Sequence, residues 1–152
     1  MGLFVKKTVI NSVISKNELI DILNENVEPF KKDGSKYLFE GKIDISGNFI
    51  IYPTFDYNAR NQIRPMIKGV VSECSEKGSQ IKIVFSLPSI MKGLIGLVVF
   101  ANLIICVVLY FNNLFLKWYM LLSFIIIFCL VAYAIYNDKV KKSLDLFERI
   151  IK

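Results

Sequence analysis

The sequence predicts an α+β fold, in which a small N-terminal sheet domain precedes a hairpin of two membrane-spanning helices and a short C-terminal helix. Two long uncharged stretches near the C-terminus predict the hairpin, and they explain a mean hydropathy of +0.48, which is high for a soluble protein. Alternating apolar and polar positions over residues 37–87 predict the sheet. We therefore expect a cytoplasmic domain at 1–88, a hairpin at 89–137 and a cytoplasmic amphipathic tail at 138–152.

The first part of the domain has the pattern of a strand followed by a helix. Residues 4–14 alternate loosely and are rich in β-branched side chains, which favours a strand. Ser15 or Asn17 then offers a helix N-cap, and apolar residues recur on one helical face until Pro29. This pattern predicts a helix over residues 16–28.

Four further strands are predicted in the rest of the domain. Short turn sequences separate four β-rich runs, so consecutive runs are expected to pair antiparallel. The predicted order of elements is therefore β-α-β-β-β-β in an antiparallel sheet. The four runs are Tyr37–Ile45, Phe49–Phe55, Ile63–Cys74 and Gln80–Leu87.

The two uncharged stretches have the length of membrane spans. Residues 93–111 and 118–136 each comprise 19 residues without a charged side chain. At about 1.5 Å per residue each helix is roughly 28 Å long, close to the roughly 30 Å hydrocarbon core of a bilayer. The connection between them is short, which forces an antiparallel pair. The lipid bilayer is therefore the first expected partner of the chain.

The positions of the lysines predict the orientation of the hairpin. The connection holds Lys117, whereas Lys92 precedes the first span and three lysines within residues 139–142 follow the second. Because positively charged flanks stay in the cytoplasm, both termini are expected on the cytoplasmic side of a plasma (inner) membrane. Residues 1–10 have neither a long apolar run nor a small-residue cleavage site, so we expect no signal peptide.

Polar and small residues within the spans predict contacts between helices. Asn102 lies near the middle of the first span, where an amide without a hydrogen-bond partner is costly, so we expect it to bond to the second helix or to a second copy of the chain. A role of Asn102 in a permeation path is the sharper alternative. Gly93 and Gly96 would permit close helix packing. These residues make a homo-oligomer one of the expected assemblies.

The tail has the pattern of an amphipathic helix. Val140, Leu144, Phe147 and Ile151 recur with helical period. Periodicity leaves three placements open, because such a helix can lie on the inner leaflet, continue the second span as a stalk, or dock on the N-terminal domain.

The composition argues against most catalytic and metal chemistry. The sequence has no histidine, which removes the commonest general base and the usual zinc ligand. Cys74, Cys106 and Cys129 have no metal or redox spacing, and no glycine-rich phosphate loop occurs. The net charge of +6 is spread along the chain without a basic stripe that carries aromatics. We therefore expect no metal, no cofactor, no nucleic-acid partner and no catalysis.

The densest polar cluster of the domain predicts an anion site. Two guanidinium groups and several amide donors on one loop could hold a phosphate, nucleotide or lipid headgroup by bidentate contacts. The alternatives are a solvated turn with a structural role, or a cationic loop that steadies the domain on anionic lipid. The cluster consists of Asn58, Arg60, Asn61, Arg64 and Lys68.

Short motifs in the predicted strands carry a resemblance to known proteins. They are F-x-G-x-I at 39–43, F-x-I at 49–51, Arg60-Asn61 followed by P-x-I-x-G at 65–69, and G-x-x-I-x-I at 78–83. Together they resemble a group of small bacterial membrane proteins with an N-terminal cytoplasmic β-rich domain and two C-terminal spans. The resemblance covers residues 39 to about 136 and departs from the group's pattern at residues 87–89. It implies architecture and supplies no activity.

Two functional hypotheses follow from the sequence. In the first, the chain is a membrane-tethered binding or interaction module, whose cytoplasmic domain recognises a protein or a small anionic ligand. In the second, it is a membrane effector of the stress, immunity or defence type, whose hairpins associate or perturb the bilayer when the domain binds a ligand.

Overall fold

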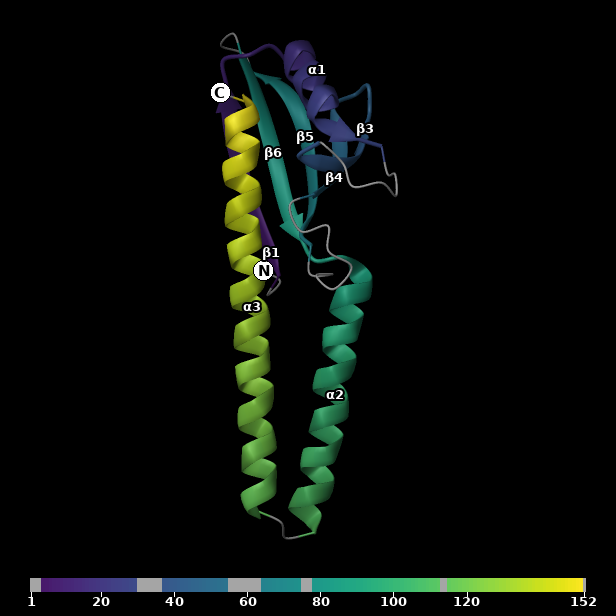
Figure 1. Ribbon diagram of the computed structural model, residues 1–152, viewed down its shortest axis with the longest axis vertical. Coiled ribbons are helices and arrows are strands. Elements are labelled where there is room, and N and C mark those ends of the chain that lie inside the picture. Colours follow the sequence, from purple (N-terminus) through teal and green to yellow (C-terminus); the bar gives the residue numbers. More distant parts are fainter. Residues whose placement is uncertain (1–3, 30–36, 55–63, 75–77, 113–114, 152) are drawn as a thin grey trace.

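A computed structural model describes residues 4–29, 37–54, 64–74, 78–112 and 115–151. It shows an α+β protein with a six-stranded mixed sheet at one end and two long helices extending from it (Figure 1). The predicted α+β class, with the sheet before two long apolar helices, is therefore confirmed, whereas the strand order and part of the strand pairing differ from the prediction.

The sheet has the strand order β1-β6-β5-β4-β3-β2. As the short turns predicted, β3 to β6 pair consecutively and antiparallel, and the N-terminal strand β1 adds antiparallel to the outer side of β6. Two edges are left, one formed by the long strand β1 and one by the very short strand β2. The strands are β1 Val5–Ser12, β2 Val27–Glu28, β3 Phe39–Ile43, β4 Asn48–Pro53, β5 Met66–Cys74 and β6 Gly78–Ser86.

The prediction of a wholly antiparallel sheet is wrong at β2. The helix α1 spans Lys16–Asn26, capped by the Ser15 side chain, and ends two residues earlier than predicted. Val27 already has extended backbone angles, and Val27–Glu28 pairs parallel with the start of β3. A β-branched residue loses less side-chain freedom in a strand than in a helix, which favours the early end of α1.

Glycine in the central strand β5 makes room for an aromatic ring. Gly69 lies directly opposite Phe49 on β4. A Cβ atom at position 69 would lie 2.2 Å from the nearest atom of the Phe49 ring, so no other residue fits there without a shift. Phe49 is almost fully buried and lies in the core on the inner face of the sheet. This close approach explains the glycine of the P-x-I-x-G motif.

The inner face of the sheet is covered by α1 and by the C-terminal half of the long helix α3, Phe115–Ile151 (Figure 1). Leu19 and Leu23 supply the buried face of α1. Phe147 of α3 is fully buried, and its ring centroid lies 5.9 Å from that of Phe39 and 5.7 Å from that of Phe49. The core of the domain therefore includes residues from both ends of the chain.

The predicted tail is the last part of α3, and its helical stripe is confirmed. Of the three placements left open, the structure combines two, because the helix runs on without a break from the second apolar stretch and also docks on the sheet. Val140, Phe147 and Ile151 are buried there, while Leu144 packs against their edge. Docking on the sheet explains why the stripe persists up to Ile151.

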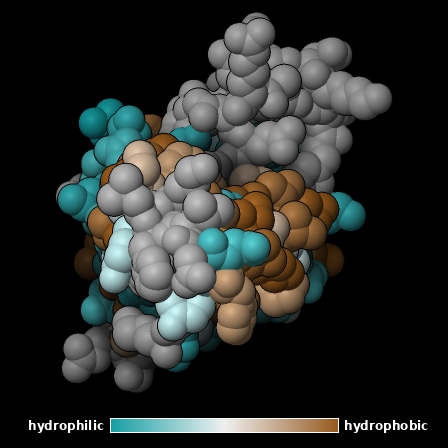
Figure 2. All heavy atoms as spheres, turned by 90° about the horizontal axis from the view of Figure 1, so that it is seen from below, coloured by the Kyte–Doolittle hydropathy of each residue, from teal (hydrophilic) through white to brown (hydrophobic). Residues whose placement is uncertain are grey.

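The hairpin consists of α2, Ser89–Phe111, and the first part of α3. Both helices are long and apolar enough to cross a membrane. Most of their side chains are exposed: Leu97, for example, is 68% exposed, whereas Cys106 and Ala132 are buried. Seen from below, brown, hydrophobic atoms gather over part of the visible surface (Figure 2).

Replacing Phe147 by alanine tests whether α3 belongs to the core of the sheet domain. We expect Phe147→Ala to lower the free energy of unfolding of the domain by about 3 to 5 kcal/mol, since it removes a fully buried ring. Pulse proteolysis in urea, on protein in detergent micelles, measures this change. Phe100→Ala, at a position that is 65% exposed in α2, is the matched control and should leave the domain's unfolding unchanged. An equal response of the two variants would contradict the packing.

Candidate functional site

The outer face of the sheet presents lysine and apolar side chains in alternation. Residues that lie directly opposite each other on neighbouring strands point to the same face. The pairings of β1, β6, β5, β4 and β3 place one row on the side away from α1 and α3. In order across the sheet this row is Lys7, Val84, Lys68, Ile50 and Lys42.

A second row repeats the alternation two residues further along the strands. Lys82 on β6 lies between Val9 on β1 and Val70 on β5. All four lysines of the two rows are exposed. Val9 is 56% exposed, and Ile50 and Val70 are each 43% exposed, so the apolar members are accessible as well. We call the lysines 7, 42, 68 and 82, with Val9, Ile50, Val70 and Val84, the basic face.

The predicted anion site divides in the structure. Asn58, Arg60 and Asn61 lie outside the described residues. Lys68 belongs to the basic face. Arg64 instead contacts the side chains of Glu40 and Tyr52 at the border of that face.

The Arg64 guanidinium is held by an acidic and an aromatic side chain. Its Nη2 lies 2.8 Å from Oε1 of Glu40, whose side chain is only 7% exposed. The same guanidinium lies over the Tyr52 ring, 5.9 Å from its centroid. An arginine that neutralises a largely buried carboxylate has a structural role, since the carboxylate would otherwise be buried without a counter-charge. Arg64 and Lys68 therefore differ in their surroundings, although the sequence places them in one cluster.

A substitution pair separates these two residues. We expect Arg64→Ala to lower the free energy of unfolding by about 1 to 3 kcal/mol, because it leaves the Glu40 carboxylate buried without its counter-charge. Lys68→Ala, at an exposed position, should change it by no more than about 0.5 kcal/mol. Urea titration of both variants in the same detergent measures the difference. If Arg64→Ala proved as stable as Lys68→Ala, the ion pair would have no structural role.

Within a single chain, the surroundings of the residues predicted for contacts between helices differ from those that we expected. The Asn102 side-chain amide donates a hydrogen bond of 2.8 Å to the Val98 carbonyl of its own helix. A Cβ atom added at Gly93 or Gly96 would meet no atom within 4 Å, so neither glycine permits a close approach inside this chain. Contacts of these three residues with a second copy remain a prediction.

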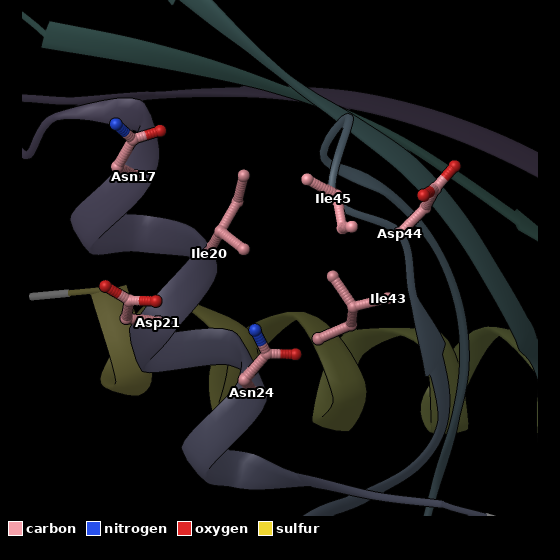
Figure 3. Close-up of a pocket in the computed structure, with 7 residues that line it drawn as sticks. All are labelled: Asn17, Ile20, Asp21, Asn24, Ile43, Asp44 and Ile45. Carbon is pink, nitrogen blue, oxygen red and sulfur yellow. The ribbon is translucent and has the colours of Figure 1, made fainter.

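Among the hollows that the described residues line on the sheet domain, two lie beside α1 and beside β1. One, of about 320 Å³, lies between α1 and the turn after β3. Ile20, Ile43 and Ile45 line its apolar centre, while Asn17, Asp21, Asn24 and Asp44 surround them (Figure 3). Asp44 accepts a hydrogen bond from Ser46, so it serves the turn rather than the hollow. This arrangement has no paired acid and base aimed at one point.

The second hollow, of about 560 Å³, follows the free edge of β1. The consecutive residues 8–14 line it together with Glu148 and Ile151 of α3. Side chains of a strand alternate between the faces, so only a hollow beside the edge can touch them all. Among the described residues that line this hollow, Glu148 is the one with a charged side chain.

The described residues form no cluster of metal ligands. They contain no group of three or more His, Cys, Asp or Glu side chains that could hold a metal ion. The three cysteines are free thiols, with Cys74 exposed on the sheet domain and Cys106 and Cys129 on the hairpin helices.

Sequence reasoning missed three of the four lysines of the basic face. Alternation places Lys7, Lys42 and Lys82 on one face of their own strands, and this signal was present in the sequence. The strand order and register that bring them beside Lys68 depend on which strands are neighbours, and the sequence pattern does not reveal that.

Comparison of the chain with protein-family models, with curated proteins and with solved structures finds no match.

Proposed function

We propose that this chain is an integral membrane protein whose sheet domain is a binding module, tethered to the cytoplasmic side of the inner membrane and without catalytic activity. The observation that supports it most is the unbroken helix α3, which joins an apolar stretch of membrane-spanning length to the core of the sheet domain. A partner bound to one surface of the sheet domain would then be held at a fixed distance from the bilayer.

The exposed apolar surface of the hairpin supports insertion into lipid. In water, side chains such as Leu97, Phe100 and Phe124, which are all more than half exposed, would present a large apolar patch. In a bilayer the same side chains meet hydrocarbon, and the backbone polar groups are satisfied within the helices. Lipid is therefore the solvent that suits this surface.

The contacts at the base of the domain support a rigid tether. Phe4, next to β1, packs edge-on against Tyr136 of α3 with 5.5 Å between ring centroids, and also lies 6.4 Å from the Tyr133 ring. These contacts lie where α3 passes from the apolar hairpin to the sheet. A flexible linker would leave the domain free to tumble, whereas a continuous helix with side contacts fixes it.

The orientation of the proposed protein follows from the lysines beside the spans. Lys92, Lys139, Lys141 and Lys142 lie at the end of the hairpin next to the sheet domain, and Lys117 lies at the connection. The positive-inside rule then places the sheet domain and both termini in the cytoplasm.

The native Cys74 reports both insertion and orientation. It is exposed on the sheet domain, whereas Cys106 and Cys129 lie in the apolar helices. A thiol reagent that cannot cross membranes should label carbonate-washed inverted vesicles strongly and intact cells weakly, because the sheet domain faces the cytoplasm. The measurement is the mass-resolved labelling of the purified chain.

Two variants control this experiment. Cys74→Ser should abolish labelling of inverted vesicles. Asn112→Cys in a Cys74→Ser background should restore labelling in intact cells, since Asn112 caps α2 at the end of the hairpin away from the sheet domain. Loss of the chain from the vesicles in the carbonate wash would refute insertion. Labelling of Cys74 in intact cells would refute the cytoplasmic orientation.

A further inference from the structure

We propose that the basic face binds an acidic, partly apolar segment of a partner protein close to the membrane. This inference rests on the proposed function, because it names the partner class of the tethered module. The face consists of Lys7, Lys42, Lys68 and Lys82 with Val9, Ile50, Val70 and Val84 between them.

The charge of the face has one sign over its centre. Among the described strand residues that point to this side, the acidic ones are Glu40 and Glu28, which lie side by side at the β2 edge. Glu40 is bound to Arg64 and is therefore already neutralised. A sheet face kept soluble by charge alone is expected to mix both signs, whereas this centre is cationic throughout. The charge complement is an acidic surface.

The spacing of the lysines suits carboxylates on one segment of chain. Lys7, Lys68 and Lys42 lie in one row with a single strand between successive members, which separates them by about 10 Å. Lys82 lies diagonally to both Lys7 and Lys68, at about 7 to 8 Å. Alternate residues of an extended segment are about 7 Å apart, so two carboxylates on one side of it reach neighbouring lysines.

The apolar members of the face argue for a protein partner. Val9, Ile50 and Val70 are accessible between the lysines, so a partner that covers the face must also bury apolar surface. Protection of a sheet edge does not explain the lysines, because Lys68 and Lys82 lie on the interior strands β5 and β6. The combination suits a segment in which acidic and aliphatic residues alternate.

Nucleic acid and lipid fit the face less well. Single-stranded nucleic acid is bound through aromatic platforms for its bases, and the one aromatic side chain on this side among the described strands, Tyr52, is covered by Arg64. The strand β6 descends toward the hairpin, and α3 rises beside it in the opposite direction, so the two axes lie roughly along one line of the molecule (Figure 1). The face therefore stands upright on the proposed membrane, and lipid headgroups can meet only its lower end.

A binding measurement with a defined polyanion tests the inference. The probe is fluorescently labelled poly-L-glutamate, titrated with the full chain in neutral detergent micelles and followed by fluorescence anisotropy. We expect saturable binding that weakens strongly in 1 M salt, because exposed charges are screened there. The variant Lys68→Gln, Lys82→Gln should lose about tenfold in affinity, which corresponds to about 1.4 kcal/mol, because it removes two exposed ion pairs with the probe.

The matched control removes the same charge elsewhere. Lys16→Gln, Lys141→Gln changes the net charge equally at α1 and α3, away from the basic face, and should lose less than threefold. Equal losses in the two double variants, or no binding by the unaltered chain, would overturn the inference. Circular dichroism confirms that both variants are folded.

Two competitors decide the partner class. The competitors are an oligothymidylate and vesicles of phosphatidylserine. If either displaced labelled poly-L-glutamate at a lower concentration than unlabelled poly-L-glutamate does, and if this required Lys68 and Lys82, the partner would be nucleic acid or lipid. That result would overturn the assignment to an acidic protein. Failure of poly-L-glutamate to bind, with Cys74 still protected in intact cells, would remove this inference and leave the membrane tether standing.

Discussion

The burial of the C-terminal half of α3 on the inner face of the sheet is the contact on which the rest of the structure depends. Phe147 fills the space between Phe39 and Phe49, and α1 covers only the neighbouring part of the face. Without α3 the Phe39 and Phe49 rings would lose the Phe147 ring that packs on them, and a six-stranded sheet with one short helix has little other apolar surface to bury. The domain therefore closes only after the chain has passed through both apolar helices.

This contact also links the sheet to the hairpin. Because α3 has no break between the apolar stretch and Ile151, a rotation or tilt of the helix moves the sheet with it. The same geometry holds the basic face upright beside the proposed membrane surface. The strand register places its lysines on the side of the sheet away from the covering helices. A partner on that face would meet a platform at fixed height, and this is the physical sense of the proposed tethered binding module.

The parts of the fold that depend on local pattern could be predicted, and those that depend on partners could not. Alternation and helical period predicted the strands, the hairpin helices and the stripe that includes Phe147. The two-residue strand at Val27 is too short to show any period, so the parallel pair was missed. The contrast between Arg64 and Lys68 arises from Glu40, which is distant in sequence and neighbouring in the fold. The basic face was missed because its lysines are brought together by the register between neighbouring strands, and the pattern of a single strand does not reveal that register.

Native-state hydrogen exchange on the full chain in detergent micelles tests the shared core most directly. If α3 is part of the domain, amides near Val140 and Phe147 and those of β5 and β6 should open together, with one free energy and one dependence on denaturant. Exchange of the last turns of α3 at a much lower opening free energy than the sheet would contradict the account, because it would show a domain that stays closed without its helix.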